Sequence, residues 1–570
     1  MRSRVAFPVF LAISFALYGN SLSGDFVFDD FSTFRKSAIR EQSFLELADD
    51  YRPVRYLSFR IDETIFGDRP WGYHVSNALL HGITSFVVFV VLRRLAGPDA
   101  ALPGALLFAA HPVHTECVAY LSGRRDVLTT LFYLLGFLCW LEFRETSRLR
   151  WIAAFLGSYA FAFFAKEMAV TLPAICLLHY VLLDPAFDRR RLRLYAAVLA
   201  LLAVPAVVHV LLSKATTQEW HGGSMTSNFA TSARLPPHYA GLLLFPLRLL
   251  GDHSYDAFPL SRSFAEGRVL LSLAAIATAV GIALRVRRRA PLVTFGIGWF
   301  LATLMPVLHI RPFHEIAAEH YLYLPSVGFC LLAGLGFERL RALAGSRVAW
   351  AALGLVLVAF SVRTVVRNRD WRDSETFWRA TVETAPRCAR AHYNLGMVHA
   401  QRAEWEEAAA RLERAIGIKP AYIAARIQLG RVQHRLGRPA DARAQWEEAL
   451  SLAQATDRFS TNAATICTLL GRYEEAIRIF EQDLETNAHA AISLRGLIGC
   501  HKALGARARR PEEAALHFRQ ALQAAERLLV ARPDDGDLLR EAADLAQAVG
   551  DGRRAAELRA QADRLGSRKR

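Results

Sequence analysis

Cysteine is scarce in this sequence, and no two cysteines have the spacing of a metal or redox site. The chain has 570 residues and seven cysteines, an odd number, with no CxxC motif. Cys139, Cys176 and Cys330 lie within apolar runs, where a thiol behaves as a small apolar side chain. We therefore expect neither a disulfide framework nor a zinc site.

Long apolar runs are absent after about residue 365, although the chain as a whole is 53% hydrophobic. Before that point apolar runs alternate with short charged loops, and after it Ala, Arg, Glu and Leu dominate. This division predicts an all-α protein in two parts. A polytopic membrane helical bundle covers residues 1–366, a juxtamembrane linker covers 367–388, and a soluble helical domain covers 389–565.

The net charge of +16 does not require a nucleic-acid partner. Many of the arginines lie in short loops between apolar runs, where the excess of Lys and Arg in cytoplasmic loops of membrane proteins already explains them. We therefore predict no nucleic acid among the partners.

Five basic loops orient the membrane part. They are Arg93–Arg94, Arg144–Arg150, Asp184–Arg193, Arg285–Arg289 and Glu338–Arg347. Eleven crossings from a cytoplasmic N-terminus place all five in the cytoplasm and the end of the chain outside. The predicted spans are Val5–Ser21, Asn77–Val91, Leu102–Tyr120, Val127–Phe143, Trp151–Ala165, Met168–Leu183, Leu194–Leu212, Gly267–Leu284, Pro291–Ile310, Tyr321–Phe337 and Val348–Val365.

One further apolar stretch, Leu235–Leu250, fits this count only if it does not cross. We interpret it as a re-entrant or interfacial helix broken by Pro236, Pro237 and Pro246. The alternative is that it spans and a weaker run, such as Leu102–Tyr120, does not. The first segment is also open to interpretation as a cleaved signal peptide, because Gly19–Ser21 resembles a cleavage site.

The predicted outer loops carry many ionisable residues. The large first loop, residues 22–76, holds Asp29 and Asp30 in GDFVFDD and Arg52 and Arg55 in YRPVRYLSFRID. The others are His111, His114, Glu116, Arg124, Arg125 and Asp126 in HPVHTECVAYLSGRRD, then Lys166 and Glu167, Asp252 in GDHSYDAFPL, and Glu319 and His320 in HIRPFHEIAAEHYLYLPS. Singly, each is explained by solvation, an ion pair or a helix cap, and for the two histidines structural hydrogen bonding is a better explanation than zinc. Together, over a membrane, they predict a functional site.

Transfer from a lipid-linked donor is the chemistry that such a face suggests. A carboxylate, here Asp29 or Asp30, takes the proton from an acceptor hydroxyl. Arginines bind the departing phosphate, because the planar guanidinium fork matches its oxygens.

The soluble part repeats every 34 residues. Ala408, Ala442 and Ala476 are 34 apart, and so are Gly437 and Gly471. This period predicts helix–turn–helix tetratricopeptide repeats, which stack into an α-solenoid with a concave groove. Tyr393, Asn394 and Arg426 are the candidate contacts in that groove.

These segments resemble the transmembrane and tetratricopeptide-repeat protein O-mannosyltransferases, a family of GT-C membrane glycosyltransferases. The matching stretches are GDFVFDD, YRPVRYLSFRID, YHVSNALLH, HPVHTECVAYLSGRRD, AKEMAVTLP, the loop from Asp252 to Leu260, AEHYLYLPSVGFCLL and RNRDWRDSETFW. The chain departs from the family pattern at His320, where Arg is expected, and at Arg125, which replaces a small residue. The first departure weakens a donor-phosphate role for position 320.

The resemblance implies an inverting transfer of mannose from a polyprenyl-phosphate donor to Ser or Thr on the non-cytoplasmic face. It implies that Asp29 and Asp30 are catalytic, with neither favoured. From their chemistry and their shared face, we expect the other outer-face residues to bind the donor phosphate and substrate. The resemblance implies no metal and no further cofactor. We expect the repeats to dock the acceptor polypeptide.

Two alternative functions are also consistent with the sequence. One is a non-enzymatic membrane-anchored scaffold, and the other is a GT-C enzyme that uses another sugar or a lipid or polysaccharide acceptor. A transporter fits less well, because the ionisable groups lie at one face and not at mid-bilayer. High Arg and Ala usage and short loops favour a bacterial inner membrane, with the repeats on the extracytoplasmic side.

Overall fold

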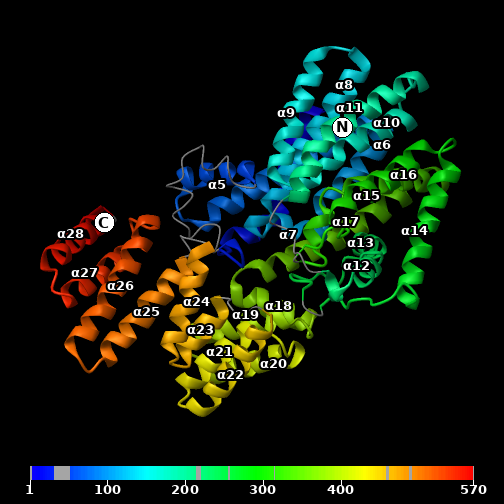
Figure 1. Cartoon of the computed structure of the whole chain (residues 1–570). Helices are drawn as coiled ribbons and strands as arrows, with labels where there is room; N and C mark the ends of the chain where they lie inside the picture. Colours follow the sequence, from blue (N-terminus) through cyan, green and yellow to red (C-terminus); the bar gives the residue numbers. More distant parts are fainter. Residues whose placement is uncertain are drawn as a thin grey trace. The chain divides into compact units, whose positions relative to one another are not determined.

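The structure is a computed structural model that describes residues 3–30, 52–212, 220–254, 257–313, 315–456, 461–486 and 491–568. Within these ranges the regular elements are all helices (Figure 1), which confirms the all-α prediction. The chain forms two compact units, residues 1–391 and 392–570, and each is described by itself. The predicted domain boundaries at 366 and 389 stay predictions.

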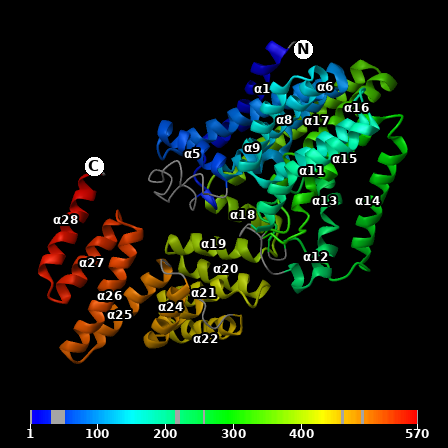
Figure 2. The same cartoon turned by 45° about the horizontal axis from the view of Figure 1, so that its top comes forward.

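The first unit contains the apolar helices. Its principal helices are α1 (Ser3–Tyr18), α5 (Pro53–Phe66), α6 (Pro70–Ala110), α7 (Thr115–Val118), α8 (Arg124–Thr146), α9 (Leu149–Ala165), α10 (Leu172–Leu182), α11 (Arg189–Leu212), α12 (Met225–Ser232), α13 (Leu235–Leu244), α14 (Gly267–Val286), α15 (Pro291–Leu304), α16 (Ser326–Ala344), α17 (Ser346–Asn368) and α18 (Ser374–Thr384). Helices α8 and α9 run side by side (Figures 1 and 2), because the chain reverses at Ser147, which has a left-handed backbone with φ of 54°.

Among the described residues, five helical segments are long and apolar enough to cross a membrane. They are Val5–Ser23, Pro70–Ala110, Leu121–Thr146, Gly267–Val286 and Ser346–Trp371. The prediction of eleven spans is wrong by this criterion. The main reason is length: Leu149–Ala165, Glu167–Leu182 and Pro291–Val307 are apolar but have fewer than 18 residues. The chain is nonetheless a multi-pass membrane protein.

Helix α6 folds back on itself and therefore has two arms. Gly97, with φ of 81°, breaks the helix immediately before Pro98, and the returning arm brings the carbonyl oxygen of Ala109 within 3.1 Å of His81 Nε2. Gly104 on that arm packs against the backbone of α16, where an added Cβ would lie 2.5 Å from the Cys330 oxygen. The predicted spans 77–91 and 102–120 correspond to these arms, although the second arm ends at residue 110.

The stretch that we predicted to be re-entrant forms the ten-residue helix α13, Leu235–Leu244. Ten residues rise only about 15 Å, roughly half the thickness of the hydrocarbon core. Pro236 and Pro237 lie in its first turn, where a missing N–H costs nothing, so they begin the helix and do not break it.

The second unit is a stack of helix pairs. It begins within α19 (Ala389–Gln401) and continues through α20 (Trp405–Ile418), α21 (Ile423–Arg435), α22 (Pro439–Thr456), α23 (Thr461–Leu469), α24 (Tyr473–Thr486), α25 (Ala491–Arg507), α26 (Pro511–Ala531), α27 (Gly536–Ala548) and α28 (Gly552–Arg568), as Figure 2 shows. The turn residues Gly437 and Gly471 have φ of 73° and 76°, a backbone region that glycine adopts at little cost. The predicted repeat is confirmed.

Candidate functional site

The two aspartates of the first outer loop differ in environment. Asp30 is 1% exposed: its Oδ1 accepts hydrogen bonds from the backbone N–H (2.9 Å) and hydroxyl (2.6 Å) of Ser122, and its Oδ2 accepts one from the Val27 N–H at 3.1 Å. Burial raises the pKa of Asp30 to about 7. Asp29 is exposed. The adjacent carboxylates thus differ in burial, with Asp30 buried and Asp29 exposed.

The backbone conformation of Phe28 explains why Asp29 and Asp30 differ in burial. Its backbone has φ of 56°, a left-handed conformation that is uncommon for an aromatic residue. Its ring packs on Phe377 and Trp378 of α18, with centroids 6.0 and 5.4 Å away, and on Tyr120 at 6.2 Å. The guanidinium of Arg390 lies 5.2 Å from the same ring. These contacts offset the backbone strain and fix the turn before Asp29.

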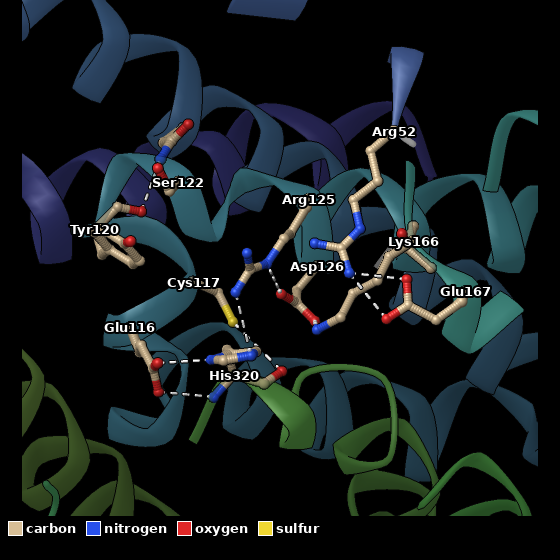
Figure 3. A network of polar contacts seen from close by, with 12 residues as sticks. Arg52, Glu116, Cys117, Tyr120, Ser122, Arg125, Asp126, Lys166, Glu167 and His320 are labelled. Atoms are coloured by element: carbon tan, nitrogen blue, oxygen red, sulfur yellow. Dashed lines mark hydrogen bonds and ion pairs between the residues drawn. The ribbon is translucent and has the colours of Figure 1, made fainter. Parts of the chain in front are cut away.

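The second group of polar residues is a network of buried ion pairs, drawn together with Ser122 in Figure 3. Arg52, just before α5, binds both carboxylate oxygens of Glu167 at 2.9 Å. Lys166 Nζ donates to Asp126 Oδ1 at 2.6 Å. Arg125, in the first turn of α8, continues the network with its Nε 3.5 Å from Asp126 Oδ2. Three cations from three segments therefore converge on two carboxylates.

Glu116 and His320 close this network. The Glu116 carboxylate accepts from the His320 backbone N–H at 2.9 Å and lies 2.6 Å from its ring Nδ1. Burial and the charge of Lys166 hold the pKa of His320 well below its usual range, and burial raises the pKa of Glu116 to about 7. With Nδ1 protonated and donating to Glu116, the neutral ring offers Nε2 as the acceptor to Arg125 Nη2, at 3.4 Å.

The two positions at which the chain departs from the family pattern, Arg125 and His320, thus contact each other. Arg125 Nε has no hydrogen-bond partner in the part of the chain that the structure describes, because its contact with Asp126 Oδ2, at 3.5 Å, is an ion pair too long for a hydrogen bond. An oxyanion oxygen placed beside Arg125 would satisfy the guanidinium.

Arg124 points elsewhere and is part of the core. Its guanidinium pairs with Asp62 at 2.5 Å and donates to Asn77 Oδ1 at 2.6 Å and to the Tyr73 carbonyl at 3.0 Å. It also lies 4.6 Å above the Phe59 ring. These partners occupy the fork, so the structure does not place Arg124 with the ion-pair network.

His111 and His114 are also buried away from the network. His111 Nε2 lies 2.9 Å from the Leu243 carbonyl oxygen, and its Nδ1 accepts from the Val113 N–H at 3.2 Å. His114 lies 2.9 Å from the Phe108 oxygen and 3.0 Å from the Ser326 hydroxyl. Both nitrogens of each ring have protein partners. Among the described residues, no group of three His, Cys, Asp or Glu is arranged to hold a metal ion.

Asp252 and Glu319 form separate ion pairs. Asp252 pairs with Arg390, which also lies 3.6 Å from Glu315, and the pKa of Asp252 is lowered by that guanidinium against the effect of burial. Glu319 accepts from the Leu250 N–H and lies 3.7 Å from Arg367 Nη2. Burial raises the pKa of Glu319 to about 8.

The remaining predicted residues have other partners. Arg55 stacks on Tyr56, with its guanidinium carbon 4.7 Å from the ring centroid. Of the candidate groove residues, Tyr393 packs on Tyr422 at 5.2 Å, and Arg426 donates to Gln445 at 3.1 Å. Asn394 lies beside Tyr393 on α19.

Sequence reasoning missed several partners in the site: Ser122, Asp62, Glu315, Arg367 and Arg390. Ser122 was within a quoted motif, HPVHTECVAYLSGRRD, and Arg367 began another, RNRDWRDSETFW. Glu315 was within the quoted motif HIRPFHEIAAEHYLYLPS but was not singled out. Nothing in the sequence marks Arg390, because its role depends on Asp252 and Glu315, which lie far from it along the chain.

Residues 53–212 match the dolichyl-phosphate-mannose-protein mannosyltransferase family, and residues 362–423 and 427–491 match the tetratricopeptide repeat family. The chain is 30% identical over 468 residues to the human protein O-mannosyl-transferase TMTC4, covering 68% of this chain and 62% of that protein. It is 29% identical over 481 residues to the mouse protein of the same name, covering 67% and 62%.

Among solved structures, the MamA protein matches 32% of this chain and 93% of its own, with 14% identity and a TM-score of 0.24. The chain spans about 62% of the length of the mannosyl-transferases it matches. It combines their two components, a mannosyltransferase-type membrane unit and tetratricopeptide repeats, and it belongs to the TMTC-type protein O-mannosyltransferase family.

Proposed function

We propose that the chain transfers mannose from a polyprenyl-phosphate donor to Ser or Thr hydroxyls of a protein acceptor, with inversion at the anomeric carbon. Its relatives carry the name protein O-mannosyl-transferase, and residues 53–212 match a family defined by a dolichyl-phosphate-mannose donor. The sugar, the donor and the face of the membrane are part of the proposal.

One short segment, Tyr120–Asp126, carries the proposal, because it joins the carboxylate pair to the cation network. Ser122 binds Asp30, and three and four residues later Arg125 and Asp126 enter the network with Lys166. The acceptor base and the phosphate-binding cations are therefore supported by the same element.

We assign the base to Asp29 and a positioning role to Asp30. In the transfer, Asp29 takes the acceptor hydroxyl proton, the acceptor oxygen forms a bond to the anomeric carbon, and the bond from that carbon to the phosphate oxygen breaks. Asp30 is the less suitable base, because both its oxygens already accept hydrogen bonds from protein groups.

The departing phosphate gains negative charge as the bond breaks, and we assign its binding to Arg125, with Lys166 and Arg52 supporting it. Fixed cations in a site that excludes water stabilise such charge more strongly than water does. Lys166 is 2% exposed and Arg125 is partly buried. We give His111, His114 and Arg124 structural roles, since their polar atoms are occupied by protein partners.

For location, we propose a bacterial inner membrane with a cytoplasmic N-terminus and extracytoplasmic repeats, so that the acceptor-docking repeats and the aspartates face one compartment. A compartment-sensitive fusion at the C-terminus tests this. A cytoplasmic C-terminus would contradict the docking role.

The test of activity uses the purified full chain in lipid nanodiscs with polyprenyl-phosphate mannose and a Ser/Thr-rich peptide. Asp29→Asn is expected to lower kcat by 10²-fold or more with an unchanged melting temperature. Asp25→Asn is the matched control, because Asp25 is an exposed carboxylate in the same loop. If Asp29→Asn transfers mannose at the parent rate, the proposal that Asp29 is the catalytic base is wrong. If the parent chain transfers no mannose, the result favours the non-enzymatic membrane-anchored scaffold.

A further inference from the structure

The repeat unit has a cavity of about 390 Å³. It lies among the first helices of three successive pairs, α21, α23 and α25, together with the end of α26. Its lining residues are Arg431, Thr465, Thr468, Leu469, Phe480, Ala491, Ile492, Arg495, Gly496, Leu528 and Arg532. The volume is within the range of ligand-binding pockets, about 300–1,000 Å³.

The floor of this cavity is built by close packing of α24 against α25. An added Cβ on Gly496 would lie 2.3 Å from the Phe480 ring, so a glycine is needed for the ring to lie there. Phe480 and Leu528 are each 1% exposed and form the base. Ile492, which is 66% exposed, and the half-buried Leu469 present accessible apolar surface at the rim.

The charged residues that line the cavity are all positive. Three lining residues are arginines and none is a carboxylate. Arg495 is largely neutralised by Glu541 at 2.6 Å and Asp535 at 3.8 Å. Arg431 and Arg532 form no ion pair within the described part of the repeat unit, so the cavity holds two uncompensated guanidiniums beside apolar surface.

We propose that this cavity binds an extended polypeptide segment in which an acidic residue adjoins a large aliphatic one. An acidic side chain in the cavity would pair with Arg431 or Arg532, both of which line it, while the aliphatic side chain contacts Leu469 and Ile492. Single-stranded nucleic acid fits less well, because its bases need exposed aromatic faces, and the one lining aromatic ring, Phe480, is buried.

This inference goes beyond the transfer reaction and is independent of it. The cavity lies at α23–α25, and its lining does not include Tyr393, Asn394 or Arg426, the residues that the sequence suggested for the groove. Binding does not require chemistry, so the Asp29→Asn variant is expected to bind the peptide with the parent Kd. Loss of transfer and loss of binding are thus separate results.

The test measures fluorescence anisotropy of a ten-residue fluorescein-labelled peptide with two Glu-Leu pairs separated by Ser, titrated with the full chain in nanodiscs. Arg431→Gln with Arg532→Gln is expected to raise Kd about fivefold to tenfold, since each lost exposed charge contact weakens binding a few-fold. Raising salt from 0.05 to 0.5 M is expected to weaken binding of the parent more than of this double variant.

The control is Arg435→Gln, an exposed arginine on α21 that does not line the cavity, and its Kd is expected to stay within twofold of the parent value. Peptides with Lys for Glu or Ser for Leu are expected to bind at least tenfold more weakly. The proposal is overturned if the double variant binds as the parent does, if the Lys peptide binds equally, if a ten-nucleotide single-stranded RNA binds more tightly, or if the Glu-Leu peptide shows no saturable binding.

Discussion

Replacing Arg124 by Met separates a structural arginine from a substrate-binding one. Arg124 is 1% exposed and pairs with Asp62 at 2.5 Å, and Asp62 is 4% exposed. Methionine fills similar space but carries no charge. It leaves the Asp62 carboxylate buried, with the Ser76 hydroxyl at 2.6 Å as its remaining hydrogen bond.

The expected cost follows from that unpaired charge. Breaking a buried ion pair by removing one partner costs about 3–5 kcal/mol, and the Asn77 and Tyr73 oxygens also lose their donor. For a unit of this size we expect the melting temperature to fall by roughly 4–6 °C. Asp62→Asn removes the stranded charge, so the double variant is expected to recover at least half of the loss.

Tryptophan fluorescence during heating of the detergent-solubilised full chain measures these shifts, and mannose transfer is measured beside it at a temperature where all variants are folded. Arg69→Met is the control, since Arg69 is exposed and its loss is expected to change stability by less than about 0.5 kcal/mol. The reasoning is refuted if Arg124→Met melts like the parent yet loses transfer. Arg124 would then bind the donor.

Three further outcomes are expected. Arg125→Ala lowers kcat/KM for the donor about 10²-fold. Adding His320→Arg restores part of the lost kcat/KM, because the His320 ring lies 3.4 Å from the Arg125 guanidinium. If the double variant shows no recovery, the donor phosphate does not bind beside Arg125. Phe28→Ala lowers kcat about tenfold at unchanged donor KM, since only the turn before Asp29 loosens; an unchanged kcat in single-turnover assays would contradict this. Burial raises the pKa of Asp30 and Glu116 to about 7 and that of Glu319 to about 8, so the stability that these three groups contribute at low pH is lost as pH rises through 8. Buried histidines with lowered pKa values, such as His320, act in the opposite direction below about pH 6.5. Melting scans between about pH 7 and 9 should therefore show a shallower fall for Glu319→Gln than for the parent.

The helical repeats and much of the membrane unit were predictable because their signals are local. The period of 34 residues, with Ala at 408, 442 and 476, predicts which positions are buried. In the structure all three alanines are 0% exposed. The number of membrane spans was not predictable in the same way. Apolar composition does not show that the chain reverses at Gly97 with φ of 81°, nor that a given apolar run ends short of a full crossing.

The candidate site was predictable in its residue types but not in its partners. Lys166 and Glu167 are neighbours in sequence, and an ion pair between them is the simplest expectation. In the structure each pairs with a different residue, Lys166 with Asp126 and Glu167 with Arg52. Such choices depend on which segments the fold brings together, and a charge pattern along one segment carries no information about that.

The difference between Asp29 and Asp30 depends most strongly on tertiary structure. Two identical side chains in adjacent positions have the same intrinsic chemistry, and sequence alone favours neither. The left-handed turn at Phe28, stabilised by α18, directs Asp30 toward the start of α8, where Ser122 binds it, and leaves the Asp29 side chain exposed. Burial raises the pKa of Asp30 to about 7, and its three hydrogen bonds to Ser122 and Val27 fix both of its oxygens. Tertiary packing thus gives two adjacent, chemically identical side chains different surroundings, and on this difference rests our proposal that Asp29 is the base.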